Sequence, residues 1–153
     1  MTTVDFFRNH LKHLGFKKRG NSFYRATEYG TQWISFVRLR SFDQYYIALG
    51  VDYNAIELTF KVTSAEKCPL QTEVKTIASM KGVMFDEEKF TSNIDREYLW
   101  QVSPRIISMI EEWFDKWSDP ADVRTWIDSD LKKWPLSAIW PQARELFGLK
   151  PRA

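Results

Sequence analysis

Apolar and polar residues alternate through three consecutive stretches of the chain, residues 31–40, 45–53 and 56–62. Alternation with a period of two is typical of strands that bury one face. The linking segments are short and rich in turn formers, including Ser41-Phe42-Asp43 and Asn54-Ala55. Because a crossover helix needs a dozen or more residues, neighbouring stretches can pair only in the antiparallel sense. The sequence therefore predicts an antiparallel meander.

A hairpin is expected to precede this meander, at residues 16–25. Gly20-Asn21 suits a two-residue turn with glycine in the first central position, where φ must be positive. That register places Lys18 opposite Phe23 and puts Phe16 and Phe23 on one face. With the hairpin, the predicted sheet has about five strands.

Helical spacing surrounds the predicted strands. Apolar residues at intervals of three and four predict helices over residues 4–14, 70–81, 104–117, 123–131 and 135–149. Ser103-Pro104 has the pattern of a helix start, and alternation at residues 98–102 leaves a late strand possible there. The predicted fold class is α+β, a single domain over residues 1–153. Its N-terminal helix and C-terminal helices pack on the antiparallel sheet.

The composition of the chain indicates the cellular compartment in which we expect the protein. The only cysteine, Cys68, cannot form a disulfide within the chain, and no apolar run has the length of a membrane span. The N-terminal segment lacks the basic start and apolar middle of a signal peptide. We therefore expect a cytoplasmic protein without membrane contact.

Residues with catalytic or metal-binding chemistry are few. His10 and His13 are three apart on a predicted helix but have no accompanying ligand cluster, and Cys68 has no histidine in a recognisable motif. Asp128 and Asp130 are two apart on a predicted helix and would point in different directions. Phosphate-loop, GxGxxG, GxSxG and HExxH motifs do not occur. A non-catalytic protein without cofactor or metal is thus favoured over an enzyme.

Tryptophan is concentrated in the last third of the chain, which holds five of the 7. Such residues either fill the core or anchor a partner. Trp134 and Trp140, beside prolines, are the best candidates for anchors. Glu111, Glu112 and Asp115 on the preceding helix supply an acidic surface next to them. Another protein, such as a toxin, is the partner that this surface predicts.

A basic cluster at the other end of the chain supports an alternative. Residues 1–40 have a net charge of +6 and the remainder −4, so the protein could steer an anionic partner, although its two halves could equally pair with each other. The candidate residues for binding nucleic acid or another anion are Lys17, Lys18, Arg19, Arg25, Arg38 and Arg40. The pI of about 8.6 is below the range of dedicated nucleic-acid domains, and cations at a hairpin tip also protect a sheet edge from aggregation.

The opening third of the chain resembles a known bacterial family. The runs LKHLGFKKRGNSFYRAT, QWISFVRLRSF and YYIALGVDYN are similar to the opening of domain of unknown function 4304. The residues that match its hairpin motif are Gly15, Phe16, Lys17, Lys18, Gly20, Phe23 and Arg25. The resemblance implies a leading helix, a hairpin and two further strands, and brings no catalytic residues. Some small bacterial cytoplasmic families of this kind are immunity proteins, which block a toxin by binding it.

Overall fold

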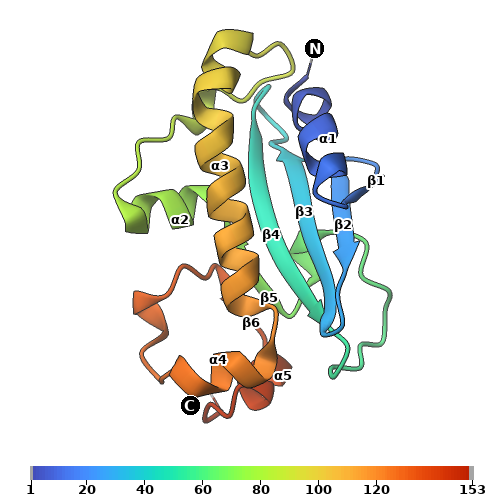
Figure 1. Ribbon diagram of the computed structural model, residues 1–153, viewed down its shortest axis with the longest axis vertical. Coiled ribbons are helices and arrows are strands. Elements are labelled where there is room, and N and C mark those ends of the chain that lie inside the picture. Colours follow the sequence, from blue (N-terminus) through green and yellow to red (C-terminus); the bar gives the residue numbers. More distant parts are fainter. Residues whose placement is uncertain (1, 152–153) are drawn as a thin grey trace.

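The computed structural model describes residues 2–151 and contains one antiparallel sheet of six strands (Figure 1). The strands follow the chain in spatial order, each pairing with the next. They are β1 (Lys17–Arg19), β2 (Ser22–Ala26), β3 (Gly30–Arg38), β4 (Tyr45–Tyr53), β5 (Leu70–Glu73) and β6 (Ala138–Ile139). The α+β class and the antiparallel sheet agree with the expectation from sequence.

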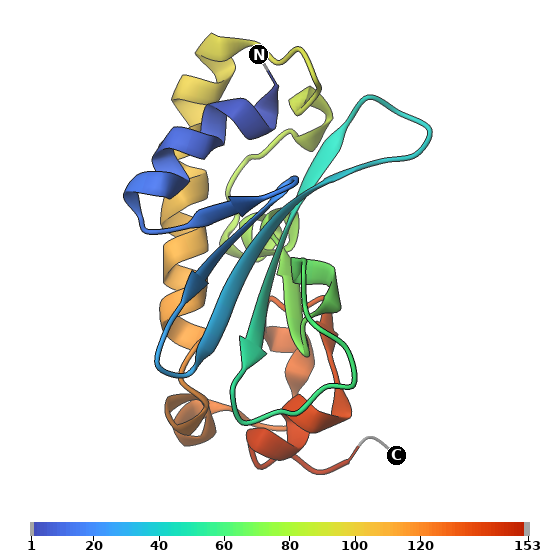
Figure 2. The same cartoon turned by 90° about the vertical axis from the view of Figure 1, so that its right-hand side faces the viewer.

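Five α-helices and three 3-10 turns complete the fold. The helices are α1 (Thr3–His13), α2 (Val74–Lys81), α3 (Arg96–Trp117), α4 (Pro120–Trp126) and α5 (Pro141–Leu146). The 3-10 turns are η1 (Ala65–Lys67), η2 (Glu87–Lys89) and η3 (Leu131–Lys133). Helices α1 and α3 lie on the same side of the sheet (Figure 2). The main core forms between them and the sheet, from side chains such as Phe7, Phe36 and Phe114.

The N-terminal helix and hairpin have the predicted form. Helix α1 begins with a capping box between Thr2 and Asp5, which satisfies backbone N–H groups that a helix start leaves free. The turn of the hairpin has Gly20 at φ +59°, and Lys18 lies opposite Phe23. Phe16 and Phe23 are both buried, so one face of the hairpin joins the core.

The predicted strand at residues 56–62 is wrong. This segment is irregular and, with η1, lies against the face of the sheet opposite α3, where Val62 and Ala65 pack on Trp33. Of its alternating apolar residues, Leu58 and Val62 pack with the cluster on this face, Ile56 packs on the main core and Phe60 is exposed. Close packing over β4 requires Gly50, because a Cβ there would lie 2.6 Å from the carbonyl oxygen of Ala65. The fifth and sixth strands are β5 and β6 instead.

Helix α3 starts eight residues before the predicted start at Pro104. Its N-cap is Asp95, whose side chain accepts a hydrogen bond from the backbone N–H of Glu97 (2.9 Å). Residues 98–102 therefore belong to this helix and form no strand. Burial of Leu99 and Ser103 extends the apolar stripe of α3 toward its N-terminus, which offsets the backbone hydrogen bond that Pro104 cannot make.

Several other helix boundaries also differ from those predicted. Helix α2 starts at Val74 because residues 70–73 form β5, whereas its predicted end at Lys81 is confirmed, with Gly82 following in the left-handed conformation. Helix α4 ends at Trp126, so Asp128 and Asp130 lie beyond it. Residues 135–140 are not helical, and only 141–146 form α5. In each case, the predicted helix includes residues that in the structure form a strand or connect two elements. Their apolar side chains still contact the core, which explains the helical spacing.

Candidate functional site

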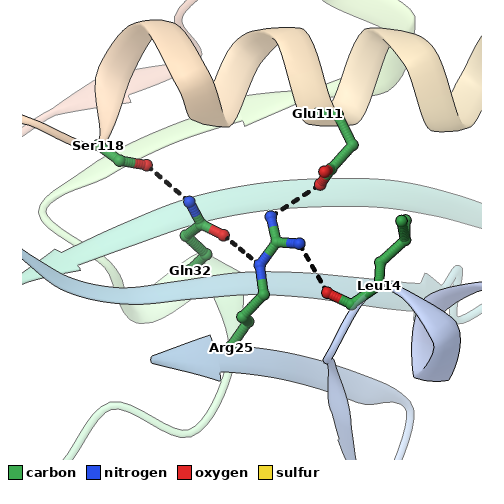
Figure 3. Close-up of polar contacts among 5 residues, drawn as sticks. All are labelled: Leu14, Arg25, Gln32, Glu111 and Ser118. Carbon is green, nitrogen blue, oxygen red and sulfur yellow. Dashed lines mark hydrogen bonds and ion pairs between the residues drawn. The ribbon is translucent and has the colours of Figure 1, made fainter. Parts of the chain in front are cut away.

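Arg25 joins four parts of the fold through its guanidinium group (Figure 3). It donates to the Gln32 side chain at 2.8 Å, to the Leu14 carbonyl at 2.8 Å and to Glu111 at 2.7 Å. The group also lies 4.2 Å from the centre of the Phe16 ring. Gln32 in turn donates to Ser118 at 2.8 Å. This network ties β2 and β3 to both α1 and α3.

Two of the predicted site residues therefore pair with each other. Arg25 was a candidate for anion binding and Glu111 for partner binding, yet they form an ion pair in which both are partly buried. The pair also links the basic first part of the chain to the acidic remainder. An outside ligand would have to break it, at the cost of leaving a charged group unpaired.

The basic residues of β1 are all exposed. Lys17, Lys18 and Arg19 each lie at the surface, and Lys18 donates to the Gly20 carbonyl at 2.6 Å. Lys17 and Lys18 line a depression of about 410 Å³ together with Arg8 and Lys12 of α1. Four cations thus surround one hollow between the hairpin and the first helix.

The remaining two candidates for anion binding lie elsewhere. Arg38 is exposed at the end of β3 and approaches Asp43 at 3.8 Å, and Arg40 is exposed in the following turn. The strand thus emerges from the core at its end.

Four tryptophans pack against one another near the C-terminal end of α3. Trp117 is fully buried and contacts Trp113, Trp126 and Trp134 with ring centroids 6.3, 4.8 and 6.1 Å apart. The ammonium of Lys116 lies 4.6 Å from the ring centres of both Trp126 and Trp134. A cation over two aromatic faces is attracted by both rings, so Lys116 helps to hold this cluster.

A groove of about 250 Å³ runs beside this cluster, between α2, α3 and η3. We call it the tryptophan groove. The residues that line it are Ile77, Met80, Lys81, Met109, Glu112, Trp113, Lys116, Trp117, Lys133, Trp134 and Pro135. Its apolar lining is buried or half-buried except for Met80, which is 47% exposed. The indole N–H of Trp113 donates to the Pro135 carbonyl at 3.2 Å, which fixes one wall.

The tryptophan groove contains only some of the residues predicted for partner binding. Trp134 and Glu112 line it, and Glu112 accepts a hydrogen bond from Lys81 at 2.5 Å. Asp115 is exposed on α3 outside the lining. Trp140 belongs to a different contact, with its ring centre 6.0 Å from that of Phe60.

The candidate nucleophile and metal ligands have other surroundings. Cys68 is buried beneath the sheet, and burial raises the pKa of its thiol well above the usual value, which disfavours the reactive thiolate. His10 packs on the rings of Phe6 and Trp100, whereas His13 is exposed. Among residues 2–151, no three His, Cys, Asp or Glu side chains come close enough to hold a metal ion. Over the same range, no helix combines the length and apolar character that crossing a bilayer requires.

Sequence reasoning missed a second hollow, on the sheet face opposite α3. Residues of β1 to β4 and of the irregular segment after β4 enclose about 360 Å³, including Trp33, Asp52 and Lys61. The available signal was Trp33, an aromatic side chain that shares its face of the strand with Thr31, Ser35 and Val37. The predicted strand at 56–62 concealed this hollow, because it placed that segment beside β4 rather than over the sheet.

These features define a small α+β protein with an antiparallel sheet, a long covering helix and a tryptophan-lined groove. The chain belongs to the family described as domain of unknown function (DUF4304), whose model matches residues 7–116. The match extends from α1 almost to the end of α3, well beyond the opening third that carries the resemblance. Trp126, Lys133 and Trp134 follow the matched range. No match was found among curated proteins or solved structures.

Proposed function

We propose that this protein is a non-catalytic binding module of the bacterial cytoplasm whose partner is another protein, such as a toxin that it blocks. The tryptophan groove carries this proposal. A volume of about 250 Å³ is smaller than most small-molecule sites and suits one or two side chains of a partner. Tryptophan, methionine and proline are together an apolar lining of the kind that anchors protein interfaces.

The charges at the groove specify the chemistry of the partner. Three lysines line it, Lys81, Lys116 and Lys133, against one carboxylate, Glu112. Lys81 pairs with Glu112, and Lys133 pairs with Asp128 outside the groove. Lys116 makes no ion pair within residues 2–151. A partner segment with a bulky apolar side chain next to a carboxylate would complement both the lining and this cation.

Paired methionine variants test this function. Met80 lines the groove, whereas Met84 lies outside it and is more exposed, 88% against 47%. Immobilised wild type, Met80→Glu and Met84→Glu are incubated with native lysate and washed at low and then high salt, and both protein and nucleic acid are measured in the eluate. We expect one protein to survive the high-salt wash on wild type and Met84→Glu and to be lost on Met80→Glu. Equal capture by all three proteins would contradict the proposal.

Nucleic-acid or anion binding by the hairpin is a second candidate. It is favoured by the hollow that Arg8, Lys12, Lys17 and Lys18 surround. Binding there would release counterions from phosphates, so affinity would fall steeply with salt. In the same experiment, nucleic acid that elutes early with salt, and that a Lys17→Gln/Lys18→Gln variant no longer captures, would support this candidate. Capture that is unchanged in this variant would refute it.

A further inference from the structure

The hollow on the sheet face opposite α3 has the size and depth of a small-molecule site. Its volume is about 360 Å³, within the range of about 300–1,000 Å³ usual for such sites. One wall is the sheet, and the other is the irregular segment that includes Leu58 and Phe60. That segment is held close by the backbone N–H of Ala65, which donates to the Ser35 hydroxyl at 2.9 Å.

The sheet wall of this hollow is aromatic and contains an unpaired donor. The rings of Tyr24 and Trp33 lie 5.1 Å apart at 33° to each other. Trp33 is only 5% exposed, and its indole N–H has no acceptor among residues 2–151. A buried donor without a partner costs about 1–3 kcal/mol, and indole can only donate. The indole nitrogen is covered by surrounding atoms, so the contact that the hollow offers a ligand is with the Tyr24 and Trp33 rings.

The charged groups around the hollow favour an anion. Arg19 and Lys61 line it, and neither forms an ion pair within residues 2–151. Asp52 is the one acidic residue in the lining, and it is also unpaired there. Burial raises the pKa of the Asp52 carboxyl. Two cations thus face one carboxyl group in the lining.

The geometry points to a binding site in this hollow for a small planar anion, with its ring near Tyr24 and Trp33 and its acidic group at Arg19 and Lys61. Aromatic carboxylates and nucleoside monophosphates share this chemistry. The site is separate from the tryptophan groove, so it can be tested independently of the proposed protein partner.

The test uses the indole N–H signals of the 7 tryptophans in the NMR spectrum of the full chain. Trp33 is assigned from Trp33→Phe, or from backbone assignment if that variant does not fold. The protein is titrated to millimolar concentrations with 1-naphthoate, with its neutral analogue 1-naphthylmethanol and, separately, with each of the four nucleoside monophosphates. We expect the Trp33 signal to shift with an anionic probe, and the Trp134 signal reports separately on any binding of the same probe in the tryptophan groove. The class of probe that binds more tightly, naphthoate or nucleoside monophosphate, identifies the chemical class of the ligand.

Charge variants show whether the anionic group is recognised. The double variant Arg19→Gln/Lys61→Gln should weaken probe binding by at least about tenfold, because it removes both cations. Lys18→Gln is the matched control, since Lys18 is equally exposed on β1 but does not line this hollow. No movement of Trp33 with any probe, equal affinity for the neutral analogue, or unchanged affinity in the double variant would each overturn the proposal.

Discussion

Arg25 makes polar contacts with three other parts of the fold. Its guanidinium connects the end of α1, β3 and α3. Each hydrogen bond to a charged group contributes about 1.5–3 kcal/mol, reduced here because the Arg25 and Glu111 side chains are 22% and 31% exposed. We expect Arg25→Ala to lower the free energy of unfolding by about 2–3 kcal/mol, measured by urea denaturation.

Arg25→Lys separates geometry from charge. Lysine keeps the positive charge but cannot make three planar contacts at once. We therefore expect the free energy of unfolding of Arg25→Lys to lie between those of wild type and Arg25→Ala. If Arg25→Ala lost less than about 0.5 kcal/mol, as ordinary surface substitutions do, the network would not have the structural role described.

Asp52 makes the stability of the folded protein depend on pH, and the direction of this dependence is known. Burial raises the pKa of its carboxyl above the usual value, so the folded state binds the proton more tightly than the unfolded state. Stability from the neutral form is therefore present at low pH and lost as pH rises through the folded pKa. The surrounding groups are Arg19, Tyr24 and Lys61 in the hollow, and Cys68 nearby.

Asp52→Asn should consequently melt at a higher temperature than wild type at pH 7. At about pH 3, where the carboxyl is mostly protonated in both states, the two proteins should melt together. Thermal denaturation followed by circular dichroism across this range measures the difference. A less stable Asn variant at pH 7 would indicate a favourable ion pair with Arg19 or Lys61 instead.

At the scale of elements, the segment over the far face of the sheet depends on Gly50. A Cβ at this position would lie 2.6 Å from the Ala65 carbonyl oxygen and 2.7 Å from the Cys68 sulfur. The first contact is with backbone, so the segment would have to move away from β4. We expect Gly50→Ala to cost about 1–3 kcal/mol, and buried Cys68 to become reactive toward a thiol reagent in the folded state. A variant with wild-type stability and an unreactive thiol would contradict this packing.

Local patterns predict the elements whose neighbours in space are also neighbours in sequence. Helix α1, the β1–β2 hairpin and strands β3 and β4 follow from helical spacing, one turn dipeptide and alternation. Residues 56–62 have equally good alternation but no hydrogen-bonded neighbour. Alternation indicates which side chains face a surface. It does not indicate whether the backbone forms hydrogen bonds with a neighbouring strand.

Contacts between distant parts of the chain are beyond such patterns. Strand β6 has two residues and pairs with β5 from almost 70 positions away. The partners Arg25 and Glu111 are 86 residues apart. Each looks like an available charge in the sequence, and only the fold brings them together. Trp134 could be singled out from its place beside Pro135, whereas Met80 and Met109 become part of the same groove only through the packing of α2 on α3.

At the scale of the whole molecule, the two sides of the sheet are built differently. Helices α1 and α3 lie on one side of the sheet, and the irregular segment after β4 lies on the other (Figure 2). The first side holds the main core, and the second has a smaller cluster and a hollow. The family match ends at residue 116, so η3 and Trp134 lie outside it. The matched part supplies strands β1 to β5 and one wall of the tryptophan groove, and the segment after it supplies β6 and the other wall.

The most direct test of the groove is to select peptides that bind it. A displayed library of random peptides is selected on the immobilised full-length protein, and each selected peptide is then measured against Met80→Glu and Met84→Glu by fluorescence anisotropy. We predict enrichment of a bulky apolar residue next to Asp or Glu, with affinity lost in Met80→Glu and kept in Met84→Glu. Selected peptides that bind all three proteins equally, or that are enriched in Lys and Arg, would contradict an apolar groove that receives an acidic partner.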